Sequence, residues 1–165
     1  MEAQYSPIQI EEKWSKIWAD RELEKPGSED HFSQIIPPPN VTGTLHMGHS
    51  FQYAIMDFYT RYHHMNGTDS YWQVGTDHAG IATQMVLENN LLNEGKSKDD
   101  LGREKFLEEV WKWKDYSEGE ISAQMKRLGI TVEWDKYRFT YDDDFCKGVN
   151  KACLLYTSDA ADDEL

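Results

Sequence analysis

The sequence PPPNVTGTLHMGH (residues 37–49) decides the fold, together with GTDHAG (residues 75–80). Each polar stretch follows a short apolar run typical of a strand, at 32–36 and 71–74, and precedes a segment with helical apolar periodicity. Two such units in succession predict a βαβ crossover, which places both polar stretches at the carboxyl edge of neighbouring parallel strands. The sequence therefore predicts an α/β fold with a ligand site at that edge.

Apolar spacing predicts the first two helices. The first is expected to begin at Pro7, with a capping box from Ser6 and Gln9, and to end at Pro26 and Gly27. The second is expected to bury a single stripe of side chains, which consists of Phe51, Ile55, Phe58, Tyr62 and Met65.

The later part of the chain is also expected to be mainly helical. A helix over 79–93 should turn four side chains inward, namely Ile81, Met85, Leu91 and Leu92. A third helical region is expected over 100–128, with a break near Gly119, followed by an irregular or short extended segment over 131–144. A last helix is expected over residues 145–152.

Length and composition indicate one folded domain. The chain has 165 residues, of which 13% are aromatic, enough to bury one core. Its formal net charge is −13, the wrong sign for a domain whose main task is to grip a phosphate backbone. Its two cysteines give no disulfide framework, and it has neither a long apolar run nor a signal pattern. We therefore expect a cytoplasmic protein without membrane contact. We separately expect a monomer.

HMGH, at residues 46–49, begins the second helix. Unpaired N–H groups and a partial positive charge at a helix start attract phosphate. His46 and His49 share one face of the first turn, so both imidazoles can point at one anion. Gly48 lets a base or ribose approach the backbone, and Gly43 provides the turn of the loop. With the polar groups of Asn40 and Thr42, these residues predict a nucleotide site.

Other interpretations of these histidines remain open. His46 and His49 could bind a metal ion with Asp77 and His78, which would suit a metal-dependent hydrolase. The same loops could form a free-standing nucleotide-binding module, or the histidines could only cap the helix. A P-loop is excluded, because the Gly-Lys-Ser sequence at residues 95–97 lacks the glycine that the motif requires five positions earlier, where the chain has Asn90.

In GTDHAG, Asp77 lies just past a strand end. A carboxylate there can hold an amino group through charge-assisted hydrogen bonds. A simple N-cap of the helix at Ala79 explains its position equally well. His63 and His64 lie late in the second helix, and we expect them on the surface without a site role.

These motifs resemble those of the class I aminoacyl-tRNA synthetases. PPPNVTGTLHMGH is similar to their HIGH motif, with Met in the second position. Its combination with GTDHAGIATQMVLE, LGREKF, MKRLG and RFTYDDD is similar to the valine-specific members. The resemblance covers about residues 5–152. It implies a Rossmann-type nucleotide-binding fold that is incomplete, with only its N-terminal half present, plus an N-terminal helix and a helical extension.

The resemblance also implies an activity, the ATP-dependent ligation of valine to tRNA(Val). His46 and His49 would contact the ATP phosphates and stabilise the charge that develops as valine's carboxylate attacks the α-phosphate. The implied ATP-binding residues are Asn40, Thr42, Gly43, His46, Gly48 and His49. Valine would lie against Pro38, Pro39, Asn40 and Asp77, with Asp77 holding its α-amino group. A magnesium ion would accompany ATP, and no structural metal is expected.

The chain departs from that family pattern in what it lacks. KMSKS, an editing domain and an anticodon-binding domain are missing, so we expect a truncated fragment, inactive alone, that leaves most tRNA contacts to other domains. Residues 1–30 would form a helical segment and 31–152 the N-terminal part of the catalytic domain. CLLYTSDAADDEL, at 153–165, resembles a translated sequencing adapter; we interpret it as a non-native tail, with a disordered acidic tail as the alternative.

Overall fold

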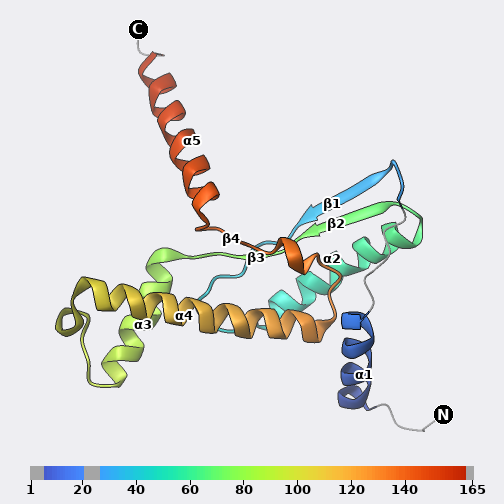
Figure 1. Ribbon diagram of the computed structural model, residues 1–165, viewed down its shortest axis with the longest axis horizontal. Coiled ribbons are helices and arrows are strands. Elements are labelled where there is room, and N and C mark those ends of the chain that lie inside the picture. Colours follow the sequence, from blue (N-terminus) through green and yellow to red (C-terminus); the bar gives the residue numbers. More distant parts are fainter. Residues whose placement is uncertain (1–5, 21–26, 163–165) are drawn as a thin grey trace.

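The computed structural model describes residues 6–20 and 27–162. Figure 1 shows its elements, which in chain order are α1 (Pro7–Asp20), β1 (His31–Ile35), α2 (Met47–Met65), β2 (Asp69–Gln73), β3 (Gly75–Thr76), α3 (Gly80–Asn93), α4 (Lys98–Leu128), a 3₁₀ turn (Trp134–Lys136), β4 (Arg138–Phe139) and α5 (Asp143–Asp162). No helix in these ranges is long and apolar enough to cross a membrane.

The strands pair in parallel, as the βαβ prediction requires. β1 pairs with β2, with His31 opposite Asp69, and β3 pairs with β4, with Gly75 opposite Arg138. Only Val74 separates β2 from β3, so these two strands form one nearly continuous line of chain. The prediction of two neighbouring parallel strands joined through a helix is confirmed.

The line formed by β2 and β3 is bonded on both sides. Ile36 donates to the Gln73 carbonyl on the β1 side at 3.0 Å. On the β4 side, Thr140 donates to the Thr76 carbonyl at 3.1 Å. Because N–H and C=O groups alternate in direction along a strand, β1 and β4 flank this line on opposite sides. The end of β3 therefore lies between the segments that follow β1 and β4.

α2 packs on the sheet through a face that the sequence analysis did not select. Tyr53 and Thr60 are its buried residues, and Gln34 of β1 donates from Nε2 to the Met56 carbonyl at 2.7 Å. The predicted buried stripe is wrong, because its members are exposed, from 44% at Ile55 to 85% at Met65. The predicted stripe and the buried row that contains Tyr53 and Thr60 both have helical spacing. The sheet contacts the buried row, which offers the Thr60 hydroxyl to Gln34 as well as aromatic and aliphatic surface.

The main core lies between α2, the sheet and the second half of α4. Its buried members are Ile36, Tyr53, Trp72, Val74, Ile121, Met125 and Ile130. α1 begins at Pro7 as predicted and contacts α4. The predicted end of α1 at Pro26 lies outside the described residues, and the helix as described ends at Asp20.

α3 and α4 form a helical hairpin with a small core of Leu87, Leu91 and Phe106. Leu91 faces inward as predicted. The other three predicted inward residues of α3 are exposed, since α4 covers the neighbouring row, and these three are Ile81, Met85 and Leu92. The break in α4 is at Gly102, with φ 72° and ψ 166°, and not at Gly119. Gly102 adopts a positive φ that a Cβ atom disfavours, whereas Gly119 remains helical.

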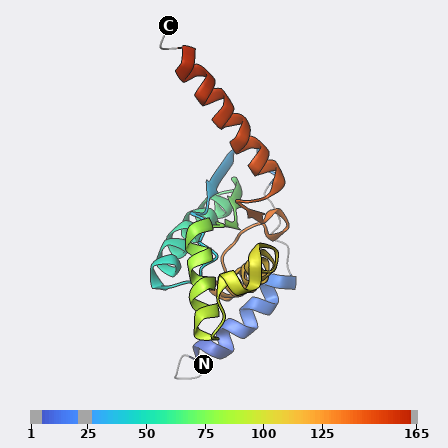
Figure 2. The same cartoon turned by 90° about the vertical axis from the view of Figure 1, so that its left-hand side faces the viewer.

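α5 extends beyond the predicted end at residue 152. It runs from Asp143 to Asp162 and projects away from the rest of the chain, as two perpendicular views show (Figures 1 and 2). Neither Pro nor Gly occurs after Cys153, and Ala and Leu there favour continuation of the helix. The interpretation of 153–165 as a non-native or disordered tail stays a prediction.

Candidate active site

Two histidines close the first turn of α2 in a reciprocal capping arrangement. His46 is the N-cap, with φ −121° and ψ 172°, and its Nδ1 accepts from the Gly48 N–H at 3.1 Å. The His46 N–H in turn donates to Nδ1 of His49 at 3.2 Å. The ring centroids lie 4.0 Å apart. The helix thus holds both imidazoles side by side at its amino end.

The capping bonds fix the tautomer of each neutral ring. An Nδ1 that accepts a hydrogen bond carries no proton, so the proton of a neutral imidazole sits on Nε2. His46 and His49 therefore each retain one N–H donor at the helix end, where the backbone dipole already favours an anion. Capping and anion binding are compatible here, because they use different nitrogens.

Gly48 has a role that the sequence analysis did not assign. A Cβ atom at this position would lie 2.9 Å from Cε1 and 3.0 Å from Nδ1 of His46. Glycine is therefore required for the His46 ring to fold back over the first turn. The predicted approach of a base or ribose to Gly48 remains a prediction.

We expect His49 to titrate below the ordinary histidine range. Partial burial, and secondly the neighbouring His46, lower the pKa of His49 from its usual 6.5. A lowered folded-state pKa contributes stability that is present above pH 6.5 and is lost as the pH falls through the lowered value. An NMR titration of the histidine ring protons measures this directly. A His49 pKa at or above 6.5 would contradict the capped, neutral geometry.

Side chains of α4 hold the loop between β1 and α2 in place. Trp113 Nε1 donates to the Val41 carbonyl at 3.0 Å, Ser117 Oγ donates to the Gly43 carbonyl at 2.9 Å, and the Leu45 N–H donates to Gln124 Oε1 at 2.7 Å. This role of α4 was not predicted from the sequence. The spacing of 113, 117 and 124 on one helix face was the available signal, but no local rule ties that face to this loop.

The two polar loops meet, as the sequence predicts. Asn40 and Asp77 form a parallel β-bridge. The Asp77 N–H donates to the Pro39 carbonyl at 2.8 Å, and the Val41 N–H donates to the Asp77 carbonyl at 3.0 Å. The bridge brings the predicted valine-side residues Pro39, Asn40 and Asp77 together, with Pro38 next in the chain. Thr42 and Gly43 follow in the loop that leads to the histidines.

Asp77 is not the N-cap of α3. The N-cap is Ala79, in the left-handed conformation with φ 42° and ψ 47°, and it makes no side-chain capping bond. Asp77 Oδ1 accepts instead from the Ala79 N–H at 3.1 Å and from Thr140 Oγ1 at 2.8 Å. Its side chain is 36% exposed, and Oδ2 accepts no hydrogen bond from the described residues. This oxygen is available to a cationic ligand.

A buried polar network supports the strand end beneath Asp77. Thr76, fully buried, donates from Oγ1 to Glu118 at 3.0 Å and accepts from the Tyr137 hydroxyl at 3.0 Å. Glu118 pairs with Lys114 at 2.6 Å. Burial raises the pKa of Tyr137, so this hydroxyl stays a donor at neutral pH. The network ties β3 to α4 and fixes the backbone from which Asp77 projects.

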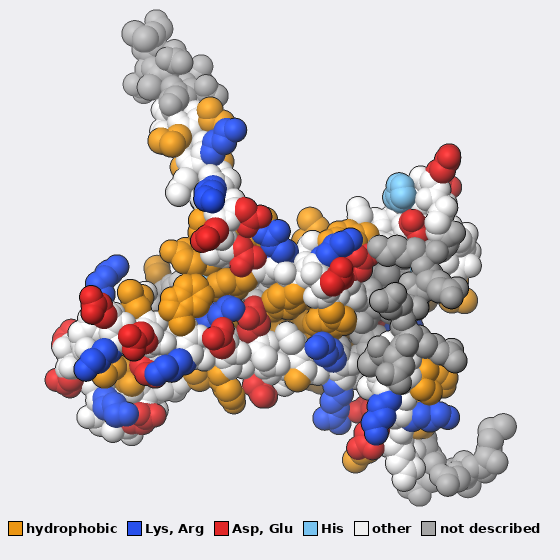
Figure 3. Space-filling model, viewed as in Figure 1, with side chains coloured by type: hydrophobic (Ala, Val, Ile, Leu, Met, Phe, Trp, Pro, Cys, Tyr) orange, Lys and Arg blue, Asp and Glu red, His pale blue; other side chains and the backbone are white. Residues whose placement is uncertain are grey.

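Aromatic side chains lie next to the second loop. The His78 ring is 5.3 Å from Tyr141 and 6.4 Å from Phe139, and Trp111 is 6.4 Å from both of those rings. Trp111 and Tyr141 are about half exposed. In the space-filling view, hydrophobic side chains gather on this side of the molecule, below the base of α5 (Figure 3). The carboxylate thus adjoins an aromatic surface.

Other groups named in the sequence analysis lie away from this chemistry. His63 and His64 are half-buried in the last turn of α2, where His63 stacks on Phe32 with ring centroids 3.9 Å apart. Within residues 6–20 and 27–162, no group of three or more His, Cys, Asp or Glu side chains is placed to hold a metal ion. The geometry does not favour the metal-dependent hydrolase.

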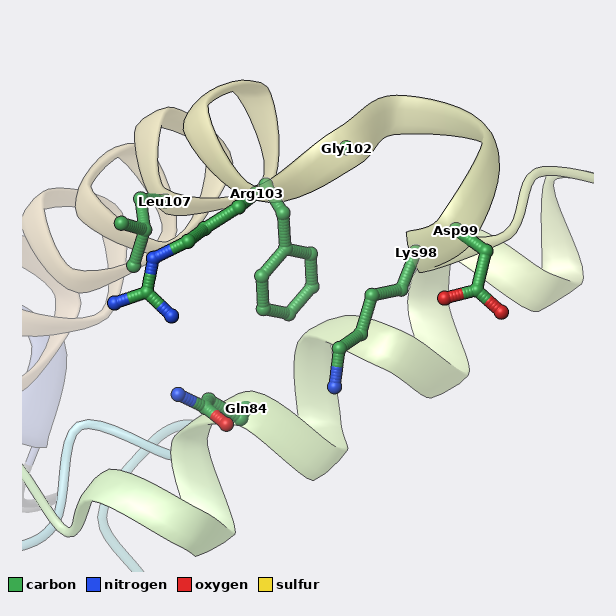
Figure 4. Close-up of a pocket in the computed structure, with 7 residues that line it drawn as sticks. Gln84, Lys98, Asp99, Gly102, Arg103 and Leu107 are labelled. Carbon is green, nitrogen blue, oxygen red and sulfur yellow. The ribbon is translucent and has the colours of Figure 1, made fainter.

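A surface cavity of about 380 Å³ lies elsewhere, between α3 and α4 near Gly102. Figure 4 shows Gln84, Lys98 and Arg103 around it, with Leu107 beside them. None of the predicted site residues lines it. The candidate site is accordingly the open edge where the loops after β1 and β3 meet.

Comparisons with known proteins identify the family. The family model described as tRNA synthetases class I (I, L, M and V) matches residues 9–159. The chain belongs to this family. The valine–tRNA ligase of Acinetobacter baylyi (strain ATCC 33305 / BD413 / ADP1) is 53% identical over 156 residues, which cover 94% of this chain and 16% of that protein. The valine–tRNA ligase of Aquifex aeolicus (strain VF5) is 48% identical over 152 residues, covering 90% and 13%.

A solved structure of this class I synthetase group shares the fold. The chain resembles the Agrobacterium radiobacter K84 agnB2 LeuRS in its ternary complex with tRNA and LeuAMS, with a TM-score of 0.69 at 21% identity. That match covers 94% of this chain and 18% of the other. The chain therefore spans about a sixth of the length of the synthetases it matches, and its residues carry the two loops described above.

Proposed function

We propose that this chain is the N-terminal part of a valine–tRNA ligase, which activates valine with ATP and transfers it to tRNA(Val). One observation carries the proposal: the Asn40–Asp77 bridge holds the family's two signature loops together at the edge of parallel strands. Open α/β sheets bind ligands at such an edge. The two valine–tRNA ligases with about 50% identity support valine as the amino acid.

In this proposal, the amino end of α2 receives the ATP phosphates. The Nε2–H groups of His46 and His49 donate to them, and the backbone dipole adds positive potential. The loop residues Asn40, Thr42, Gly43 and Gly48 border the nucleotide. Magnesium enters as part of the Mg·ATP substrate, held mainly by the phosphates.

Valine binds on the other side of the bridge. The free oxygen of Asp77 accepts from its ammonium group, and the loop at Pro38, Pro39 and Asn40 borders its remaining atoms. A valine carboxylate oxygen then attacks the α-phosphorus, and the bond from that phosphorus to the pyrophosphate oxygen breaks. The imidazole donors stabilise the added charge on the phosphate oxygens, so the chain acts by positioning and electrostatics.

The proposal includes features of the whole enzyme. The parallel sheet would be the first half of a Rossmann-type fold, and tRNA(Val) would contact mainly regions of the longer relatives that lie outside the segment matched by this chain. We further propose a cytoplasmic monomer. The isolated chain would show little activity, because it would lack those regions.

A chimera tests the proposed function. Residues 6–152 of this chain replace the matching segment of the Acinetobacter baylyi valine–tRNA ligase, and ATP–pyrophosphate exchange is measured with valine, isoleucine and leucine. We expect exchange that depends on valine. The same chimera with both His46 and His49 changed to Ala is the control and should lose exchange. Exchange that isoleucine or leucine supports better than valine would contradict the valine assignment.

A further inference from the structure

Thr140 lies in RFTYDDD, outside the two polar loops that form the candidate site. Its hydroxyl lies between Asp77 and His78, although 63 residues separate Thr140 from Asp77. Thr140 Oγ1 is 2.8 Å from Asp77 Oδ1, 3.0 Å from the His78 backbone nitrogen and 2.9 Å from His78 Nδ1. One hydroxyl thus contacts both polar side chains of the second loop.

The donors and acceptors at this hydroxyl can be assigned. A threonine hydroxyl has one proton and two lone pairs. A carboxylate only accepts, so the proton of Thr140 is donated to Asp77, and the lone pairs accept from the His78 N–H and from Nδ1–H of the ring. The Nδ1–H also faces Asp77 Oδ1 at 3.2 Å. The contacts that reach the carboxylate all end on Oδ1 and leave Oδ2 outside the network.

The backbone holds Thr140 rigidly. Thr140 directly follows β4, and its N–H donates to the Thr76 carbonyl at 3.1 Å, next to the residue that carries the site carboxylate. The turn after β4 is closed by Asp142, which accepts from the Phe139 N–H at 3.1 Å and from Arg138 Nε at 3.1 Å. β4 approaches β3 closely, since a Cβ at Gly75 would lie 2.2 Å from the Arg138 carbonyl oxygen.

We propose that Thr140 is a positioning residue, which orients Asp77 so that Oδ2 faces the amino group of the amino acid substrate. The inference rests on the proposed function of Asp77. Without the Thr140 hydroxyl, Oδ1 keeps only the Ala79 N–H at 3.1 Å and the longer His78 Nδ1 contact at 3.2 Å, and both come from the loop that carries Asp77 itself. The Thr140 hydroxyl adds the shortest of these contacts, at 2.8 Å, from a separate segment that follows β4, and this anchor outside the loop holds the carboxylate in one orientation.

The test uses the chimera and compares Thr140→Val, which removes the hydroxyl at constant shape, with Thr140→Ser, which keeps it. We expect Thr140→Val to raise the KM for valine about tenfold, the scale of one hydrogen bond to a charged group, with the KM for ATP unchanged. Thr140→Ser should restore the KM for valine to within about threefold of the parent value. Thr140→Ala replaces Thr140→Val if the latter does not fold.

A matched control is provided by Thr131, whose hydroxyl donates to Asp57 Oδ1 on α2 at 2.6 Å. Thr131→Val removes the same kind of bond and should leave both KM values unchanged. If Asp77→Asn raises the KM for valine but Thr140→Val does not, the role of Thr140 is wrong and the proposed function stands. If Asp77→Asn has no effect on that KM, the amino-group role of Asp77 fails, and the role of Thr140 fails with it.

Discussion

Asp77→Asn in the chimera is expected to raise the KM for valine about 100-fold, while the KM for ATP changes by less than about threefold. Asn keeps the shape of Asp and an Oδ1 that accepts from Ala79 and Thr140. It replaces Oδ2 with an NH₂ group, so the substrate ammonium group loses an anionic acceptor and meets a donor. Steady-state ATP–pyrophosphate exchange at varied valine and at varied ATP measures the two constants.

Asp115→Asn is the matched control for this substitution. Asp115 lies on α4 with its side chain 74% exposed, so removing its charge should change neither constant. Equal increases in the KM for valine and for ATP with Asp77→Asn would show that Asp77 supports the site as a whole. The assignment of Asp77 to the amino group would then be wrong.

His46→Asn is expected to lower kcat for adenylate formation about 100- to 1,000-fold, as the loss of one donor to developing charge does in other enzymes. Asn is a good N-cap residue and can replace Nδ1 as the acceptor for the Gly48 N–H. The substitution therefore removes the Nε2–H donor and preserves the helix start. The rate of adenylate formation in a single turnover measures the loss of the donor. Thermal unfolding measures any loss of helix capping.

His46→Ala is the companion variant, because it removes both the donor and the cap. We expect the same loss of rate as for His46→Asn, plus a loss of stability of about 1 kcal/mol. If His46→Asn retains the parent rate while His46→Ala is destabilised, His46 is only a cap. That pair of results would reinstate the capping interpretation and remove the histidine from catalysis.

The sequence was informative wherever local chemistry determined the structure. The order of strand, polar loop and helix predicted the parallel pairing and the meeting of the two polar loops at one edge, since crossover rules leave few other arrangements. The start of α1 at Pro7 followed from helix-capping preferences. The spacing of His46 and His49 placed both rings on one turn, which the structure confirms.

Other features depended on tertiary contacts that no local pattern encodes. α2 has two rows of large side chains at helical spacing, and periodicity alone could not decide whether Tyr53 or Phe58 faces the sheet. The hydroxyl of Thr140 reaches Asp77 only because β4 pairs with β3, and each of these strands is two residues long. Such short strands carry no alternation that a sequence pattern could detect.

We propose that two imidazole donors and one carboxylate hold the two ends of an aminoacyl-adenylate across the bridged loops. A crystal structure of the chimera with a non-hydrolysable valyl-adenylate analogue tests it most directly. We expect Nε2 of His46 and His49 on the phosphate side of the analogue and Asp77 Oδ2 within hydrogen-bond distance of its amino group. An analogue bound with its amino group away from Asp77, or with both imidazoles turned from its phosphate side, would contradict the claim.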